Sequence, residues 1–201
     1  STNSRDCRCL EGIQQSPEIL NRLEHSPNRK DRIKPDWAAE LAYITAGKGE
    51  LIPVSVICDL YVEDRVSNRR YAFELKAPLP NSDQTKVSKE KILKLHCMEP
   101  PLVDNAYFAL PYNPYGSREN YSWSFPARWF DMKHDDVVLI GDEFWDTIGG
   151  AGTYTAFISA INEIGAEYKE RIYREYLGIE PPEHSDAALT TLQEHGEAYR
   201  V

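Results

Sequence analysis

The stretch "VICDLYVEDRVSNRRYAFELKA" (residues 56–77) decides the fold, because it predicts two strands joined by a short turn. Apolar and polar side chains alternate on both sides of the turn, as they do in strands with one buried face. We expect the first strand over residues 50–64, the turn over residues 65–68 and the second strand over residues 69–77. A four-residue turn makes this pair of strands an antiparallel hairpin.

The register of this hairpin follows from its turn. Pairing that places Asp64 opposite Arg69 also places Asp59 opposite Glu74, with Lys76 on the same face of the sheet. The other face is then apolar on both strands, which supports the register because a one-residue slip would scramble it. Its members are Val56, Cys58, Leu60, Val62, Tyr71, Phe73 and Leu75.

Two carboxylates that face each other across a strand pair are normally destabilising. A bound cation would remove the repulsion between Asp59 and Glu74, and Mg²⁺ is the natural candidate because it prefers carboxylate and carbonyl oxygens. The alternative is that Glu74 and Lys76 lie on an exposed sheet face and partly cancel each other's charge. The matched position of Asp59 favours the metal site.

A further carboxylate is offered by the helix that precedes the hairpin. Pro35, Asp36 and Trp37 predict a helix start, and Glu40 follows in "DWAAELAYI" beside the apolar side of that helix. Glu40 is therefore a candidate to complete the metal site, with an ordinary surface glutamate as the equally weighted alternative.

The remaining chain predicts an α/β fold with a mixed central sheet and flanking helices. Helices are expected over residues 85–96 and 153–177, and buried strands in "LVDNAYFALP" and "DDVVLIGDEF". We expect three parts. These are a polar, partly helical N-terminal segment (1–35), a single catalytic domain (36–178) and a polar C-terminal tail (179–201). The chain begins with Ser1 rather than Met, which is typical of a processed or clipped product.

The composition is that of an ordinary globular protein with a net charge of −9, so no global basic field indicates a nucleic-acid partner. A polyanion would need a local basic patch or acidic groups neutralised by cations. No apolar stretch approaches the length of a membrane span. The four cysteines are too few and too irregularly spaced for a disulfide framework, and we expect a reducing, cytoplasmic setting.

These residues together resemble the PD-(D/E)xK nuclease superfamily. Its core is a helix with a glutamate, a strand with an aspartate and a second strand with E-x-K, here Glu40, Asp59 and Glu74-Leu75-Lys76. Cys58 stands where the name of the superfamily has proline, which is the loosest part of the pattern. The resemblance covers about residues 36–110.

A narrower resemblance lies in "FELKAPLPNSDQTK", "YFALPYNPYG" and "LIGDEFWDTIGG", which look like type II restriction endonucleases of the TdeIII type. Members of that group are associated with GGNCC-type palindromes. The resemblance implies a homodimer that cuts double-stranded DNA at a palindromic site, since a two-fold protein matches a two-fold sequence.

The superfamily resemblance also implies roles for the residues. Asp59, Glu74 and the backbone carbonyl of Leu75 would hold Mg²⁺ against the scissile phosphate, and Glu40 would help hold a second ion or its water shell. Lys76 would orient or deprotonate the attacking water. In-line attack would expel the 3′-oxygen and leave a 5′-phosphate.

DNA contacts are expected from two segments. The segment "NSDQTKVSKEK" enters a helix, and a helix N-terminus with nearby lysines suits a phosphate. The long loop "PYNPYGSRENYSW" carries side chains of the types that contact base edges. The alternatives are a helix capped by Ser82 or Asp83 with solvated lysines, and an aromatic loop packed on the body. The candidate residues are Asn81, Gln84, Lys86, Lys89, Asn113, Arg118 and Asn120.

Three rival functions remain. A structure-specific repair nuclease of the same fold would need no base-reading loop. A non-catalytic DNA-binding module would not need Asp59, Glu74 and Lys76 in register. A two-carboxylate glycosidase would need no metal.

The longest predicted helix carries an apolar stripe that predicts a core or dimer interface. Its members are Phe157, Ile161, Ile164, Tyr168, Ile172 and Tyr176.

Overall fold

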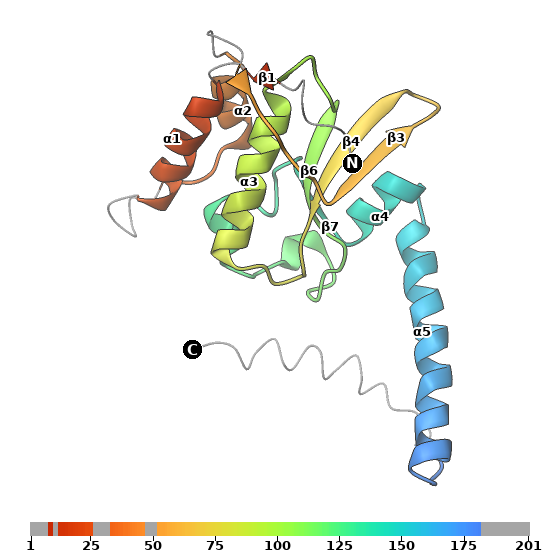
Figure 1. Ribbon diagram of the computed structural model, residues 1–201. Coiled ribbons are helices and arrows are strands. Elements are labelled where there is room, and N and C mark those ends of the chain that lie inside the picture. Colours follow the sequence, from red (N-terminus) through yellow and green to blue (C-terminus); the bar gives the residue numbers. More distant parts are fainter. Residues whose placement is uncertain (1–7, 10–11, 26–32, 47–51, 182–201) are drawn as a thin grey trace.

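The computed structural model describes residues 8–9, 12–25, 33–46 and 52–181. The expectation for the C-terminal tail, residues 182–201, falls outside these ranges. Figure 1 shows the arrangement of the described elements, with colours that follow the sequence from red to blue.

The central sheet in this part of the chain has the strand order β3-β4-β6-β7. Strand β3 (Leu60–Asp64) pairs antiparallel with β4 (Arg69–Leu75). Strand β4 pairs parallel with β6 (Asn105–Leu110), which pairs parallel with β7 (Val138–Ile140). The expected α/β fold with a mixed sheet is therefore confirmed.

Helices cover both faces of this sheet (Figure 1). Helices α1 (Gly12–Glu24), α2 (Trp37–Thr45) and α3 (Ser82–His96) share one core with the face that carries Ala72, Ala106 and Phe108. Helix α4 (Asp142–Gly149) packs Phe144 against Phe73 and Ala109 on the opposite face. Because both faces are covered, β6 lies in the interior, as its continuous apolar sequence predicts.

Helix α1 contributes to the same core as the strands of the central sheet. Ile19, Leu20 and Leu23 are each less than 5% exposed and pack in the cluster that includes the sheet. The apolar core thus extends into the segment that the sequence analysis placed before the catalytic domain. A smaller sheet with the order β2-β1-β5 lies beside this core, formed by Ile52–Pro53, Arg8–Cys9 and Met98–Glu99.

The hairpin register is confirmed along the whole ladder, from Asp64 opposite Arg69 to Leu60 opposite Phe73. The predicted long first strand is wrong, because residues 54–59, between β2 and β3, do not belong to a strand. At Asp59 the backbone amide still donates to the Phe73 carbonyl at 3.1 Å, while the side-chain Oδ2 accepts a hydrogen bond from the Leu75 amide at 2.9 Å. The chain bends out of the ladder at this residue.

The bend also corrects the predicted single apolar face. Val56 and Cys58 pack against the core beneath α1, α2 and α3, whereas Leu60 and Val62 pack on the α4 side of the sheet. The alternation of apolar residues continues through the bend, but it changes the side of the sheet that it covers. A sequence pattern of period two cannot register such a crossing.

Helix α5 (Thr153–Arg171) extends away from the sheet and continues into a π-helical turn, η4 (Ile172–Tyr176) (Figure 1). Its apolar stripe does not lie in the core of this chain, because Phe157, Ile161, Ile164 and Tyr168 are 37–56% exposed. None of the helices in the described part of the chain combines the length and apolar character that crossing a membrane requires.

Candidate active site

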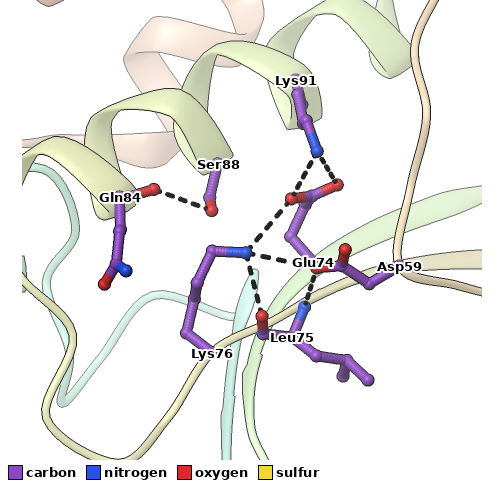
Figure 2. A network of polar contacts seen from close by, with 7 residues as sticks. All are labelled: Asp59, Glu74, Leu75, Lys76, Gln84, Ser88 and Lys91. Carbon is purple, nitrogen blue, oxygen red and sulfur yellow. Dashed lines mark hydrogen bonds and ion pairs between the residues drawn. The ribbon is translucent and has the colours of Figure 1, made fainter.

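The side chains of Asp59, Glu74 and Lys76 meet at the end of β4 (Figure 2). The Lys76 ammonium donates to the Leu75 carbonyl at 2.9 Å, to Asp59 Oδ2 at 3.2 Å and to Glu74 Oε2 at 3.4 Å. The backbone of Leu75 contributes on both sides, because its amide holds Asp59 and its carbonyl accepts from Lys76. The Leu75 main chain therefore connects the Asp59 and Lys76 side chains.

Exposure differs sharply among these groups. The Glu74 side chain is 1% exposed, whereas Lys76 is 19% and Asp59 is 41% exposed. Burial raises the pKa of the Glu74 carboxyl above its ordinary value, although hydrogen bonds from a lysine oppose that rise. The site is thus a buried carboxylate with an opening on the Asp59 side.

The opposing lysine is Lys91, which the sequence analysis missed. It extends from α3 toward the sheet and donates to both oxygens of Glu74, at 2.9 and 3.0 Å (Figure 2). Gln84, Ser88 and Lys91 follow one another at helical spacings of four and three residues, so they share one face of α3. That spacing was a usable signal, because it marks a polar stripe on a helix that must cover a sheet.

The three oxygen atoms expected to hold Mg²⁺ all surround the same positive group, the Lys76 ammonium. Asp59 Oδ2, Glu74 Oε2 and the Leu75 carbonyl all lie within 3.4 Å of the Lys76 ammonium. All three are hard oxygen donors, the kind that Mg²⁺ prefers. The donor set therefore fits a Mg²⁺ ion with two carboxylates and one carbonyl. No group of three or more His, Cys, Asp or Glu side chains suited to a metal occurs within the described residues.

Glu40 belongs to a different cluster. Its carboxylate forms an ion pair with Lys89, whose side chain is fully buried and also donates to the Trp129 carbonyl. The Lys89 ammonium lies 4.9 Å from the centre of the Phe130 ring. Burial raises the pKa of Glu40 and lowers that of Lys89. Glu40, an expected metal ligand, is thus paired with Lys89, an expected phosphate contact, and not with the Asp59 and Glu74 group.

The other candidates at the start of α3 are also engaged. Asn81, rather than Ser82 or Asp83, caps the helix by accepting from the Gln84 amide at 2.8 Å, and Gln84 accepts in return from the Asn81 amide. Lys86 pairs with Glu24 of α1. Asn81 and Gln84 are exposed, so a capping role leaves them accessible at the surface.

The polar residues of the long loop differ in how far they are buried and bonded. Asn113 is 5% exposed and accepts from the Tyr115 amide at 3.0 Å. The Arg118 guanidinium donates to both Glu143 carboxylate oxygens at 3.1 Å, and also to the carbonyls of Met132 and Asp135. These two side chains hold the loop in place. Asn120, at the end of the short helix η2 (Arg118–Asn120), is exposed.

Aromatic residues of this loop hold the segment that follows β4, a role that the sequence analysis did not assign. The Tyr121 hydroxyl donates to the Pro78 carbonyl at 2.9 Å, and the Trp123 indole to the Pro80 carbonyl at 2.8 Å. The Trp129 indole, just after the short helix η3 (Pro126–Arg128), donates to Ser82 Oγ at 3.0 Å. The path from Lys76 to α3 is therefore tied to the loop by hydrogen bonds.

Comparison with known families supplies an independent observation. The family model of the type II restriction endonuclease HinfI matches residues 10–165, which is more than half of the chain. The chain belongs to the HinfI family of type II restriction endonucleases. The matched region of this family includes the site around Glu74, all of α1 to α3, and the aromatic loop.

The curated relatives that the chain matches are also type II restriction enzymes. Over 125 residues the chain is 32% identical to the type II restriction enzyme HgiCII, 31% to HgiEI and 30% to HgiBI, all from Herpetosiphon aurantiacus. Each alignment covers 61% of this chain, and 45%, 44% and 44% of the respective relatives. The chain thus spans less than half the length of the relatives that it matches.

Proposed function

We propose that this chain is a Mg²⁺-dependent, sequence-specific endonuclease that hydrolyses double-stranded DNA and leaves 5′-phosphates. The observation that carries the proposal is the meeting of Asp59, Glu74, the Leu75 carbonyl and Lys76 at one point. This arrangement supports a PD-(D/E)xK site, and membership in the HinfI family supports the nuclease activity.

The residues of the chain have distinct roles in this reaction. Bound Mg²⁺, held by Asp59, Glu74 and the Leu75 carbonyl, would offset the negative charge of the transition state and polarise a water. The Leu75 amide fixes the Asp59 carboxylate, and Lys76 supplies a positive charge and hydrogen-bond donors for orienting the attacking water. Attack on phosphorus breaks its bond to the 3′-oxygen, which leaves a 5′-phosphate and a 3′-hydroxyl.

A homodimer acting on a palindrome is part of the proposal. The exposed stripe of α5 supports it, because Ile161, Ile164 and Tyr168 form an apolar row that a second copy of the helix would cover. Changing Ile164→Glu places a charge in that row and is expected to convert the dimer to a monomer in light scattering. Glu163→Ala, one residue away and off the stripe, is the matched control. A monomeric parent chain would refute this part of the proposal.

The experiment that tests the cleavage activity uses phage DNA and short duplexes with GGNCC palindromes, the sequence class that the TdeIII-like segments indicate. The parent chain is expected to give discrete bands with Mg²⁺ and none with EDTA, and Asp59→Ala is expected to give none in either. Sequencing of fragment ends then gives the cut position and tests for 5′-phosphates. Smearing would contradict sequence specificity, and absence of cleavage with any divalent ion would refute the enzyme function.

A further inference from the structure

Two lysines donate hydrogen bonds to the Glu74 carboxylate, although a single lysine would be enough to balance its charge. Lys91 donates to both of its carboxylate oxygens, and Lys76 donates to one of them (Figure 2). Lys76 has further acceptors in Asp59 and the Leu75 carbonyl. Within the described residues, both hydrogen bonds of the Lys91 ammonium go to Glu74, so its position depends on that carboxylate.

The charges of this group balance before any metal binds. Asp59 and Glu74 contribute two negative charges, and Lys76 and Lys91 contribute two positive ones. A divalent cation would therefore add two uncompensated positive charges beside a carboxylate that is 1% exposed. Water screens charges weakly at such a position, so the repulsion between the cation and Lys91 is costly. A DNA phosphate in the site brings the negative charge that offsets it.

We propose that Lys91 is a positioning residue that makes divalent-cation binding depend on bound DNA. This inference rests on the nuclease function proposed above and deepens it. In the free protein Lys91 occupies both oxygens of Glu74 and competes with the cation for them. Its side chain is 30% exposed, so its flexible stem can turn the ammonium toward a phosphate when DNA arrives. The cation then gains access to Glu74, and Lys91 contacts the DNA backbone.

Thermodynamic reciprocity gives the proposal a second consequence. If DNA increases the affinity for the cation, the cation increases the affinity for DNA by the same factor. Removing the Lys91 charge should weaken this coupling in both directions. Lys94, also on α3, pairs with Glu90 rather than with Glu74 and offers a matched control.

The test measures Mn²⁺ binding to the whole chain without DNA, by electron paramagnetic resonance of the free ion. Lys91→Gln is expected to bind Mn²⁺ about tenfold more tightly than the parent chain, which corresponds to about 1.4 kcal/mol. Lys94→Gln is expected to match the parent chain. Unchanged or weaker Mn²⁺ binding by a folded Lys91→Gln would overturn the proposal.

A second variant covers the case in which Lys91→Gln does not fold. Lys91→Arg keeps the charge and grips a carboxylate with two parallel hydrogen bonds, so it is expected to weaken Mn²⁺ binding severalfold. Unchanged or tighter Mn²⁺ binding by Lys91→Arg would overturn the proposal.

Fluorescence anisotropy of a labelled GGNCC duplex, with and without Ca²⁺, measures the coupling from the DNA side. Ca²⁺ should strengthen DNA binding by the parent chain more than by Lys91→Gln, and an equal effect would overturn the coupling.

The outcome for Lys91 can be separated from that for the nuclease function. Mn²⁺ binding that is lost in Asp59→Ala but equal in the parent chain and Lys91→Gln would refute the role of Lys91 alone. Mn²⁺ binding that is absent from the parent chain and all variants, with and without DNA, would refute both proposals. Absence of cleavage together with tighter Mn²⁺ binding by Lys91→Gln would refute the nuclease function and leave the competition at Glu74 supported.

Discussion

Helix α3 joins two lysine–glutamate clusters that differ in their access to solvent. Lys89 pairs with Glu40, with exposed fractions of 0% and 10%. Lys91 pairs with Glu74, and the adjoining Asp59 is 41% exposed. The two lysines are two residues apart, so they point about 200° apart around the helix. The same residue types, a lysine and a glutamate, thus form a buried pair on one face of α3 and a solvent-accessible group on the opposite face.

This difference teaches that access, rather than the presence of acids and lysines, separates a candidate catalytic group from a structural ion pair. The Lys89 side chain is 0% exposed and its ammonium contacts the Trp129 carbonyl and the Phe130 ring, so a substrate phosphate has no access to it from solvent. The Glu74 group keeps one side accessible through Asp59. Replacing residues in each cluster should therefore affect different properties.

The largest effect is expected from Lys76→Ala. Loss of a positioned proton donor or acceptor in general acid–base catalysis costs about 10²–10⁴-fold in rate, so cleavage should fall by about a thousandfold while the fold is retained. The measurement is the single-turnover rate on a GGNCC duplex, with circular dichroism to check folding. Lys94→Ala serves as the control and should cleave at the parent rate. A Lys76→Ala protein with more than a tenth of the parent rate would contradict a catalytic role.

A large loss of stability is expected from Lys89→Met in the closed pair. The change leaves Glu40 buried without its partner, which typically costs about 3–5 kcal/mol in free energy of unfolding. Urea denaturation gives this value. The double change Glu40→Leu with Lys89→Met removes both charges and should restore most of the loss. A loss below about 1 kcal/mol in Lys89→Met would show that the pair is not closed.

A pH-dependent effect is expected from Glu74→Gln. Burial raises the pKa of Glu74 in the folded chain above its value in the unfolded chain. At pH values between these two pKa values, the folded state therefore binds more protons than the unfolded state. The stability from this group is full below the unfolded pKa and is lost as the pH rises through the folded pKa. The unfolding free energy of Glu74→Gln relative to the parent should therefore increase from pH 4 to pH 8.

One proton limits this change to about 1.4 kcal/mol per pH unit. Denaturation series at several pH values measure it. Glu63→Gln, on the exposed side of β3, is the matched control for loss of a strand carboxylate. A relative stability of Glu74→Gln that decreases with pH would contradict the direction of the shift.

The smallest effect is expected at the start of the helix that both clusters share. Asn81→Ala removes the side chain that caps α3, and loss of such a cap costs about 1 kcal/mol. Both clusters should weaken together, so the melting temperature should fall by a few degrees while the cleavage rate per folded molecule stays near the parent value. A large loss of cleavage in stable Asn81→Ala would instead indicate a DNA contact.

The sequence predicted the hairpin well because its information is local. Turn length and alternation set the pairing of Asp64 with Arg69, and the position of Asp59 beside Glu74 follows from that pairing. The bend at Asp59 was not predictable from alternation, because it involves a side chain that accepts a hydrogen bond from the backbone of the neighbouring strand. The span of α5 followed from its apolar periodicity, whereas α3 begins at Ser82, three residues before its expected start.

The partners of the longer side chains depended on packing between distant segments. Glu40 and Lys89 are 49 positions apart, and Arg118 reaches Glu143 in α4. Either pair requires knowing how a helix crosses its neighbour, which a single sequence does not specify. For Lys91 the helical spacing marked the face of α3 that covers the sheet, but its partner Glu74, 17 positions away on β4, depends on how the helix packs on the sheet.

Leu75 contributes to the site only through its backbone, which affects the side chains that this position can accept. Its amide and carbonyl serve Asp59 and Lys76, while its side chain packs with Phe73, Phe144 and their neighbours on the other side of the sheet. Every amino acid except proline offers the same amide and carbonyl. Selection at this position therefore acts on volume and shape in the apolar core. The middle residue of E-x-K is free to follow changes in the core without altering the chemical groups that the backbone supplies.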